Sequence, residues 1–235
     1  MGFYHNQILD DIADVINVVT FKNPMVFNEW LQNFIAEKTV EYLSPDLLPI
    51  SNRCLRLRVE SAALGTSVNA NSLYIHEGFN EVMNLSGLPT DAKAYFTDFF
   101  EDVQNLDIET SSELNDAITF IKNKEDNVID DLEANGRYAI DMAFYMMAVA
   151  RYSCDYWPNN FTDSSSKWYN MDIKFEDHDD WDIPVPAAKH WSEYAADDAA
   201  AALSSVVVSL GAVGPWGALA SAALGTGWSI VSNNS

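Results

Sequence analysis

The chain has 235 residues and a mass of 26.2 kDa, enough for one large domain or two small ones with a sizeable core. Hydrophobic residues make up 48% of it and charged residues 20%, which is typical of a globular rather than a disordered protein. The formal net charge of −22 argues against nucleic acid as a partner and against permanent docking on anionic lipid, because both need a basic protein face.

The first part of the chain predicts a series of helices. Apolar side chains recur at three- and four-residue steps between residues 8 and 19, which is the pattern of an amphipathic helix. Asn23 and Pro24 have the types preferred at an N-cap and at the first helical position, so a second helix begins there and ends before Ser44. Residues 51–65 fit a strand or a helix, and we favour a helix; residues 68–85 predict another.

The middle of the chain is also predicted to be helical. Thr90 opens a helix with a bulky apolar face, and the spacing of Thr110 and Glu113 is that of a capping box, which begins a helix reaching Leu132. After Gly136 comes an apolar run over residues 138–152. This run is too short to span a bilayer and contains two charged residues, so we expect a buried core helix.

Composition changes after Trp157. Residues 158–186 are rich in Ser, Asp, Asn and aromatic side chains, and we expect a mainly irregular connector whose aromatic residues hold it on the helical body. The sequence therefore predicts an all-α fold, a multi-helix globular bundle in one compact domain. Its expected parts are an acidic helical body over 1–157, the connector over 158–186 and a C-terminal apolar helical hairpin over 187–235.

The C-terminal segment carries no ionisable side chain after Asp198. Gly and Pro between residues 211 and 215 should break it into two apolar helices joined by a tight turn. Small residues at four-residue spacing let helix backbones approach closely, as in membranes, and the two Trp side chains suit a membrane interface. The residues that define the predicted hairpin are Ala201, Ser205, Ser209, Gly211, Gly214, Pro215, Trp216, Gly217, Ser221, Gly225 and Trp228.

This ending resembles the hydrophobic helical hairpin of pore-forming colicins and the Gly/Ala-rich segments of membrane-active bacteriocins. The resemblance covers about the last 40 residues, rests on composition and spacing, and assigns no functional residue. The pattern Ser153-Cys-Asp-Tyr-Trp157, then Lys167-Trp168, then Ala196-Asp-Asp198 before a small-residue tail looks like that of uncharacterised bacterial proteins with similar endings. That likeness implies no activity.

The lengths of the two arms and the insertion free energies of their residues limit the membrane interpretation. A span needs about 20 apolar residues, and each arm offers only about 15 to 17. Favourable insertion of Leu, Val and Ile is opposed by Gly, Ser and Pro, so we expect conditional insertion rather than a permanent transmembrane hairpin. Asp197 and Asp198 lie at the predicted root of the hairpin, where protonation in acid would lengthen the apolar arm. Two alternatives stay open: the arms are buried central helices, or they form an oligomerisation or docking face.

Other candidate sites are weaker. A cluster of carboxylates and one imidazole offers ligands for Ca²⁺ or Mg²⁺ but lacks EF-hand spacing, so a solvated acidic loop is favoured. Its members are Glu176, Asp177, His178, Asp179, Asp180 and Asp182. The histidines, His5 among them, are scattered; His76 and Glu77 could form half of an acid–base pair, but surface or capping roles are favoured. We interpret Cys54 and Cys154 as buried free thiols.

The sequence thus favours a bacterial membrane-active toxin or effector whose C-terminal hairpin inserts conditionally, without enzymatic activity or a cofactor. Its expected partners are the lipid bilayer of a target cell and a delivery machinery, chaperone or immunity protein; the oligomeric state is left open. The N-terminus lacks the features of a signal peptide, so we expect synthesis in the cytoplasm and export by a dedicated secretion or injection system. The alternative is a non-catalytic cargo, adaptor or structural component of such an assembly. A metal-dependent hydrolase using residues 176–182 is the third reading.

Overall fold

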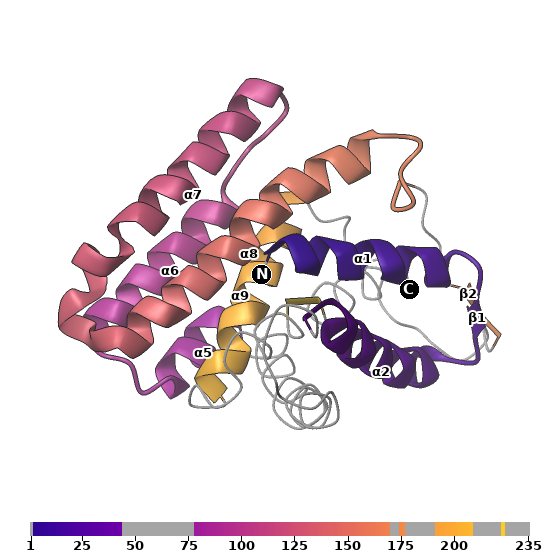
Figure 1. Ribbon diagram of the computed structural model, residues 1–235, viewed down its shortest axis with the longest axis horizontal. Coiled ribbons are helices and arrows are strands. Elements are labelled where there is room, and N and C mark those ends of the chain that lie inside the picture. Colours follow the sequence, from indigo (N-terminus) through magenta and orange to yellow (C-terminus); the bar gives the residue numbers. More distant parts are fainter. Residues whose placement is uncertain (1, 44–77, 170–173, 177–190, 209–221, 224–235) are drawn as a thin grey trace.

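The computed structural model describes residues 2–43, 78–169, 174–176, 191–208 and 222–223, and these form a mainly helical protein (Figure 1). This confirms the predicted all-α class. The α-helices are α1 (Gly2–Ile16), α2 (Pro24–Leu43), α5 (Phe79–Leu85), α6 (Thr90–Gln104), α7 (Ser111–Leu132), α8 (Gly136–Thr162) and α9 (Trp191–Val208). A 3-10 turn, η2 (Glu133–Asn135), joins α7 to α8.

Two helix starts follow the predicted capping chemistry. Asn23 precedes α2, and its side-chain oxygen accepts a hydrogen bond from the backbone N–H of Val26 at 3.0 Å. At the start of α7, the Thr110 hydroxyl accepts from the Glu113 N–H, and the Glu113 carboxylate accepts from the Thr110 N–H at 2.8 Å. These bonds satisfy backbone donors that a helix leaves unpaired at its first turn, so the starts of α2 and α7 are confirmed.

Helix α8 is longer than predicted, because it runs through Pro158 to Thr162. Proline has no N–H, so the ladder loses one bond there. Just beyond Pro158, the side chains of Asn159 and Asn160 donate to the carbonyls of Asp155 and Tyr156 at 2.7 and 2.9 Å. These bonds give two carbonyls of the last turns a side-chain donor. The expected boundary between body and connector at residue 158 therefore falls inside α8.

Two further local predictions differ from the structure. The predicted helix over 68–85 cannot pass unbroken through Gly78, whose φ of 83° ends regular helix, and α5 begins at Phe79. A short parallel pair was not expected either: β1 (Thr20–Phe21) pairs with β2 (Lys174–Phe175). That pairing ties the stretch predicted as connector to the segment between α1 and α2.

Three of the described helices pack directly on α9. It packs against α8 on one side and against α6 and α5 on others, while α7 packs on α8 (Figure 1). Helix α1 also packs on α8, and α2 packs on α1. The buried apolar residues of all these helices form one continuous cluster. The described part of the C-terminal segment thus lies at the centre of the protein rather than on its surface.

Candidate functional site: the buried helix α9

Helix α9 is enclosed on all sides over residues 199–203. Residues 199–203 are consecutive and cover more than one full helical turn, yet none of them exposes any surface to solvent. Trp191 and Tyr194, at the start of the helix, are 7% and 6% exposed. The residues of α9 with no exposed surface and an apolar side chain are Ala195, Ala196, Ala199, Ala200, Ala201, Ala202 and Leu203.

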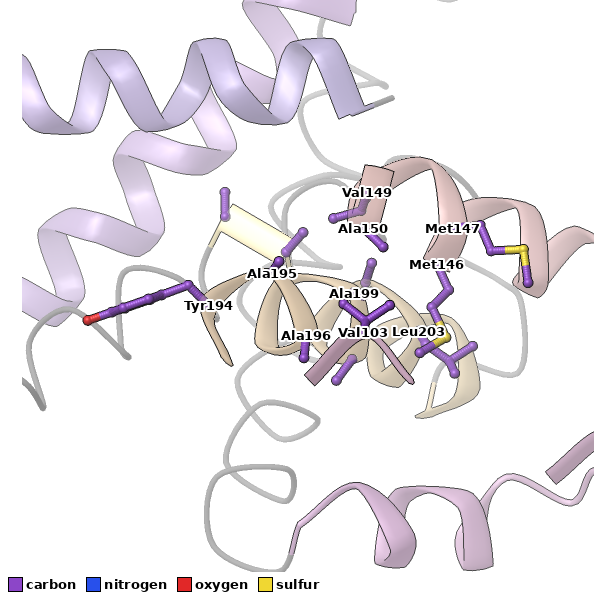
Figure 2. Close-up of a cluster of buried hydrophobic side chains, with 14 of the residues drawn as sticks. Val103, Met146, Met147, Val149, Ala150, Tyr194, Ala195, Ala196, Ala199 and Leu203 are labelled. Carbon is purple, nitrogen blue, oxygen red and sulfur yellow. The ribbon is translucent and has the colours of Figure 1, made fainter. Parts of the chain in front are cut away.

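The small side chains of α9 face larger ones on its neighbours. Figure 2 shows Ala199 and Leu203 beside Met146 of α8 and Val103 of α6. Alanine lets the helix axes approach closely, and flexible methionine side chains fill irregular gaps between them. The Ala-rich composition of this segment is therefore explained, in the folded protein, by close packing at the centre of the bundle.

The two aspartates predicted at the root of the hairpin lie inside α9 instead. The helix begins at Trp191, so Asp197 and Asp198 come two turns later, at 6% and 0% exposure. Asp198 accepts a hydrogen bond from the indole N–H of Trp157 on α8 at 2.9 Å. It is a polar contact within the core rather than the edge of an apolar arm.

His5 of α1 reaches the same carboxyl group. Its side chain is fully buried, and its Nε2 lies 3.6 Å from Asp198 Oδ2, which is longer than a hydrogen bond. Its Nδ1 lies 3.0 Å from the side-chain oxygen of Asn6, whose amide donates to the Tyr152 carbonyl at 3.1 Å. Burial lowers the pKa of His5 to about 4, because the charged imidazolium loses its hydration.

No place in the core was assigned to His5 from the sequence. A signal for its burial is present in the sequence. His5 lies three and four residues before Ile8 and Leu9 and seven before Ile12, which places it on the apolar face of α1. A polar residue on such a face needs a partner in the core, and that partner lies almost two hundred residues away in the sequence.

Aromatic side chains complete this junction. The Trp157 ring lies 5.2 Å from that of Tyr194 on α9 and 5.4 Å from that of Trp168, measured between centroids. Trp168 donates its indole N–H to the Tyr156 hydroxyl, which in turn donates to Asp10 of α1 at 2.7 Å. The expectation that aromatic residues hold the segment after α8 on the helical body is confirmed for Trp168.

The chemistry-bearing groups at this junction are unsuited to nucleophilic catalysis. Cys154 is a free thiol, and burial raises its pKa far above the usual range, which keeps it protonated and inert. His5 and Asp198 are likewise sealed from solvent, so a substrate cannot reach them in this state. The predicted buried thiol is confirmed for Cys154, while Cys54 lies outside the described residues.

Most of the predicted hairpin lies outside the described residues. Ala201 is buried, and Ser205 belongs to the last turn of α9. Ala222 and Ala223 are helical and fully buried. The predicted residues outside the described ranges are Ser209, Gly211, Gly214, Pro215, Trp216, Gly217, Ser221, Gly225 and Trp228.

The predicted metal cluster is also mostly outside the described residues. Glu176 is exposed, and its backbone N–H donates to the Phe21 carbonyl at 2.9 Å, next to the β1–β2 pair. Residues 177–182 are not described. Within the described ranges, no group of three or more His, Cys, Asp or Glu side chains could hold a metal ion.

Among the described residues, no helix combines the length and the apolar character needed to cross a membrane. No protein family model, curated protein or solved structure matches the chain.

Proposed function

We propose that the protein is a non-enzymatic, membrane-active toxin or effector that stores the apolar helix α9 at the centre of a helical bundle and inserts its C-terminal segment into a target membrane when the bundle opens. The observation that carries this proposal is the complete burial of residues 199–203 on every face of α9. A helical turn that is apolar all round, as residues 199–203 are, needs either a protein core or a bilayer around it. In the folded protein the helical bundle supplies the protein core.

The outer helices of the bundle are suited to water on their exposed faces. Helix α1 buries its face from His5 to Ile16 and exposes Asp10 and Asp14. Helix α6 similarly buries Phe96, Phe99 and Val103 while its acidic residues face outward. Such a layer keeps an apolar helix in solution as long as the layer stays closed. The folded chain therefore has a polar surface, with the apolar helix α9 buried inside it.

The buried aspartates set the condition for insertion. Each charged Asp placed at the centre of a bilayer costs roughly 2.5 to 3.5 kcal/mol on the insertion scale. Two of them outweigh the small gain expected from the Ala-rich helix, so α9 does not enter lipid whole while Asp197 and Asp198 are ionised. The part after Asp198, which carries no charged side chain, enters first, and the two carboxyl groups stay at the interface or become neutral.

This function implies partners and a route. The chain would be made in the cytoplasm of a bacterium and delivered to a target cell by a dedicated secretion or injection system. A chaperone or immunity protein would protect the producing cell by keeping α9 enclosed. These proposals follow from the membrane activity and are tested with it.

Leakage of a dye from vesicles tests the function directly. The protein is added to vesicles of phosphatidylcholine and phosphatidylglycerol at neutral pH and at about pH 5, where acid-loosened states of proteins form. We expect leakage under at least one condition. The variant Gly214→Lys places a charge at the predicted turn, which must cross the hydrocarbon, and should abolish leakage. Gly214→Gln, of similar length but neutral, should keep it.

Circular dichroism of both variants in buffer shows whether they fold as the wild type does. Absence of leakage from the wild-type protein at either pH contradicts the proposal, as does equal leakage by Gly214→Lys and Gly214→Gln. Either outcome favours the second candidate, a non-catalytic cargo, adaptor or structural component whose α9 is simply core. A stable stoichiometric complex with another protein would then be expected.

A further inference from the structure

The turn between α1 and α2 carries the most exposed large apolar side chains of the described residues. Val18, just after α1, is 81% exposed, and Met25, in the first turn of α2, is 71% exposed. Val26 beside it is 38% exposed. Single exposed apolar residues are common on folded proteins, but these three fall within one short stretch of the chain. The folded bundle leaves them in water, which is the less favourable environment for them.

The backbone that presents these side chains is firmly held. Phe21, which lies between them in the sequence, is buried, and its ring centroid is 4.9 Å from that of Phe27 and 5.1 Å from that of Trp30. Strand β1 pairs with β2, and the side chain of Asn17 donates to the Lys167 carbonyl at 3.1 Å. Apolar side chains on an ordered turn can enter another phase without the further cost of ordering the backbone.

The turn also lies at one end of the molecule. Figure 1 shows β1 and β2 at one end of its long axis, while α7 lies at the other. Helices α6 and α7 carry many acidic residues, and charges more than about 8 Å away are largely screened at physiological salt. The net charge of −22 therefore does not decide what this end of the molecule can contact.

The charges at the turn differ from those of the chain as a whole. Lys22 is exposed, and no ion-pair partner for it is found among the described residues. Lys174 lies on the paired strand β2. Of the nearby acids, Asp14 is paired at 2.6 Å with a lysine that follows α8, whereas Glu29 lies one turn further along α2 and Glu176 follows β2. A lysine without such a partner thus lies between the exposed apolar side chains.

We propose that this turn is a lipid-contact tip, made of Val18, Lys22, Met25 and Val26, with which the closed bundle docks reversibly on an anionic bilayer. The apolar side chains enter the headgroup region, and the Lys22 ammonium group binds a lipid phosphate. This inference deepens the proposed function by naming the surface that brings the protein to its target membrane. It rests on that function only for the insertion that follows docking.

The small size of the lipid-contact tip favours lipid over a protein partner. A stable protein interface takes about 20 to 30 residues from each side, with closely matched shapes. A bilayer needs no matched shape, and a few apolar side chains beside a cation gain affinity from both the acyl boundary and the headgroup charge. One lysine and three apolar side chains give weak, reversible binding, which agrees with a chain that is acidic elsewhere.

Sedimentation with sucrose-loaded vesicles at neutral pH tests the lipid-contact tip. We expect the protein to bind vesicles of phosphatidylcholine and phosphatidylglycerol, and to bind pure phosphatidylcholine more weakly. Met25→Asp should weaken binding at least about tenfold, because an apolar side chain is replaced by a charged one.

Phe3→Asp is the matched control for Met25→Asp. Both residues are exposed and second in their helices, where an acidic side chain suits the helix dipole, so both variants should fold. Phe3 lies at the opposite end of α1 from the turn, so Phe3→Asp should bind as the wild type does.

Two further variants separate the contributions. Lys22→Gln should weaken binding to the mixed vesicles about fivefold and leave binding to pure phosphatidylcholine unchanged. Val18→Trp should strengthen binding to both, because tryptophan favours the membrane interface. If circular dichroism shows that Met25→Asp does not fold, Val18→Trp decides.

Absence of vesicle binding by the wild type, or equal binding by Met25→Asp and Phe3→Asp, would overturn the lipid-contact tip. Unchanged binding by Val18→Trp, or by Lys22→Gln to the mixed vesicles, would do the same. Vesicle binding without leakage at either pH would keep the lipid-contact tip and contradict only the proposed function. Leakage that Met25→Asp leaves undiminished would keep the proposed function and overturn the tip.

Discussion

The close contact at Gly2 gives a prediction in which two effects have opposite signs. A Cβ atom at Gly2 would lie 2.5 Å from the Ala148 carbonyl oxygen and 2.6 Å from Tyr152 Cβ. Ordinary contact begins at 3.4 Å, so α1 and α8 would have to separate by roughly 0.9 Å (3.4 minus 2.5). Helix propensity alone favours Gly2→Ala by about 0.5 to 1 kcal/mol, whereas such overpacking costs about 1 to 3 kcal/mol.

We therefore expect Gly2→Ala to lower the free energy of unfolding by about 1 to 2 kcal/mol, measured by urea denaturation at neutral pH. Ala94→Gly, at an exposed position of α6, serves as the control, because it should report propensity alone at about 1 kcal/mol. A Gly2→Ala protein more stable than the wild type would refute the close docking of α1 on α8.

Three further changes test other parts of the structure by the same denaturation assay. Thr110→Ala removes the capping box of α7 and should cost about 1 kcal/mol, while Ser112→Ala, exposed in the same turn, should change stability by less than about 0.5 kcal/mol; equal effects would contradict the cap. Ala199→Leu adds volume on a fully enclosed face of α9 and should destabilise by about 1 to 3 kcal/mol, whereas no loss would mean that α9 is less enclosed than described. Tyr156→Phe removes the acceptor of the buried Trp168 indole and the donor to Asp10, and should cost about 1 to 3 kcal/mol; a neutral result would show that this network contributes nothing.

The helical elements could be predicted where the sequence carries local signals. The starts of α2 and α7 depend on capping side chains within three residues of the helix. Such short-range capping motifs can be recognised in a single sequence. The end of α8 was missed because Pro158 is normally a stop signal, and the side chains that bond the carbonyls of the last turns follow it. The β1–β2 pair joins segments about 150 residues apart, so no local sequence pattern predicts it.

The candidate site was predicted less completely than the fold. The Ala-rich composition singled out α9, but composition alone fits both a bilayer and a tightly packed core. The placement of Asp198 beside Trp157 and His5 depends on how α1, α8 and α9 are assembled in three dimensions. The apolar face of α1 carries a signal for the burial of His5 that the sequence analysis did not use, whereas its partner could be identified only from the structure.

The central claim is that α9 exchanges a protein core for lipid. Hydrogen exchange of residues 191–208, measured at about pH 5 with and without vesicles, tests it most directly. The account predicts that α9 loses protection in acid without lipid and recovers it when vesicles are present, while α1 and α6 stay unprotected. Loss of protection in acid that vesicles leave unchanged in α9 would contradict the claim.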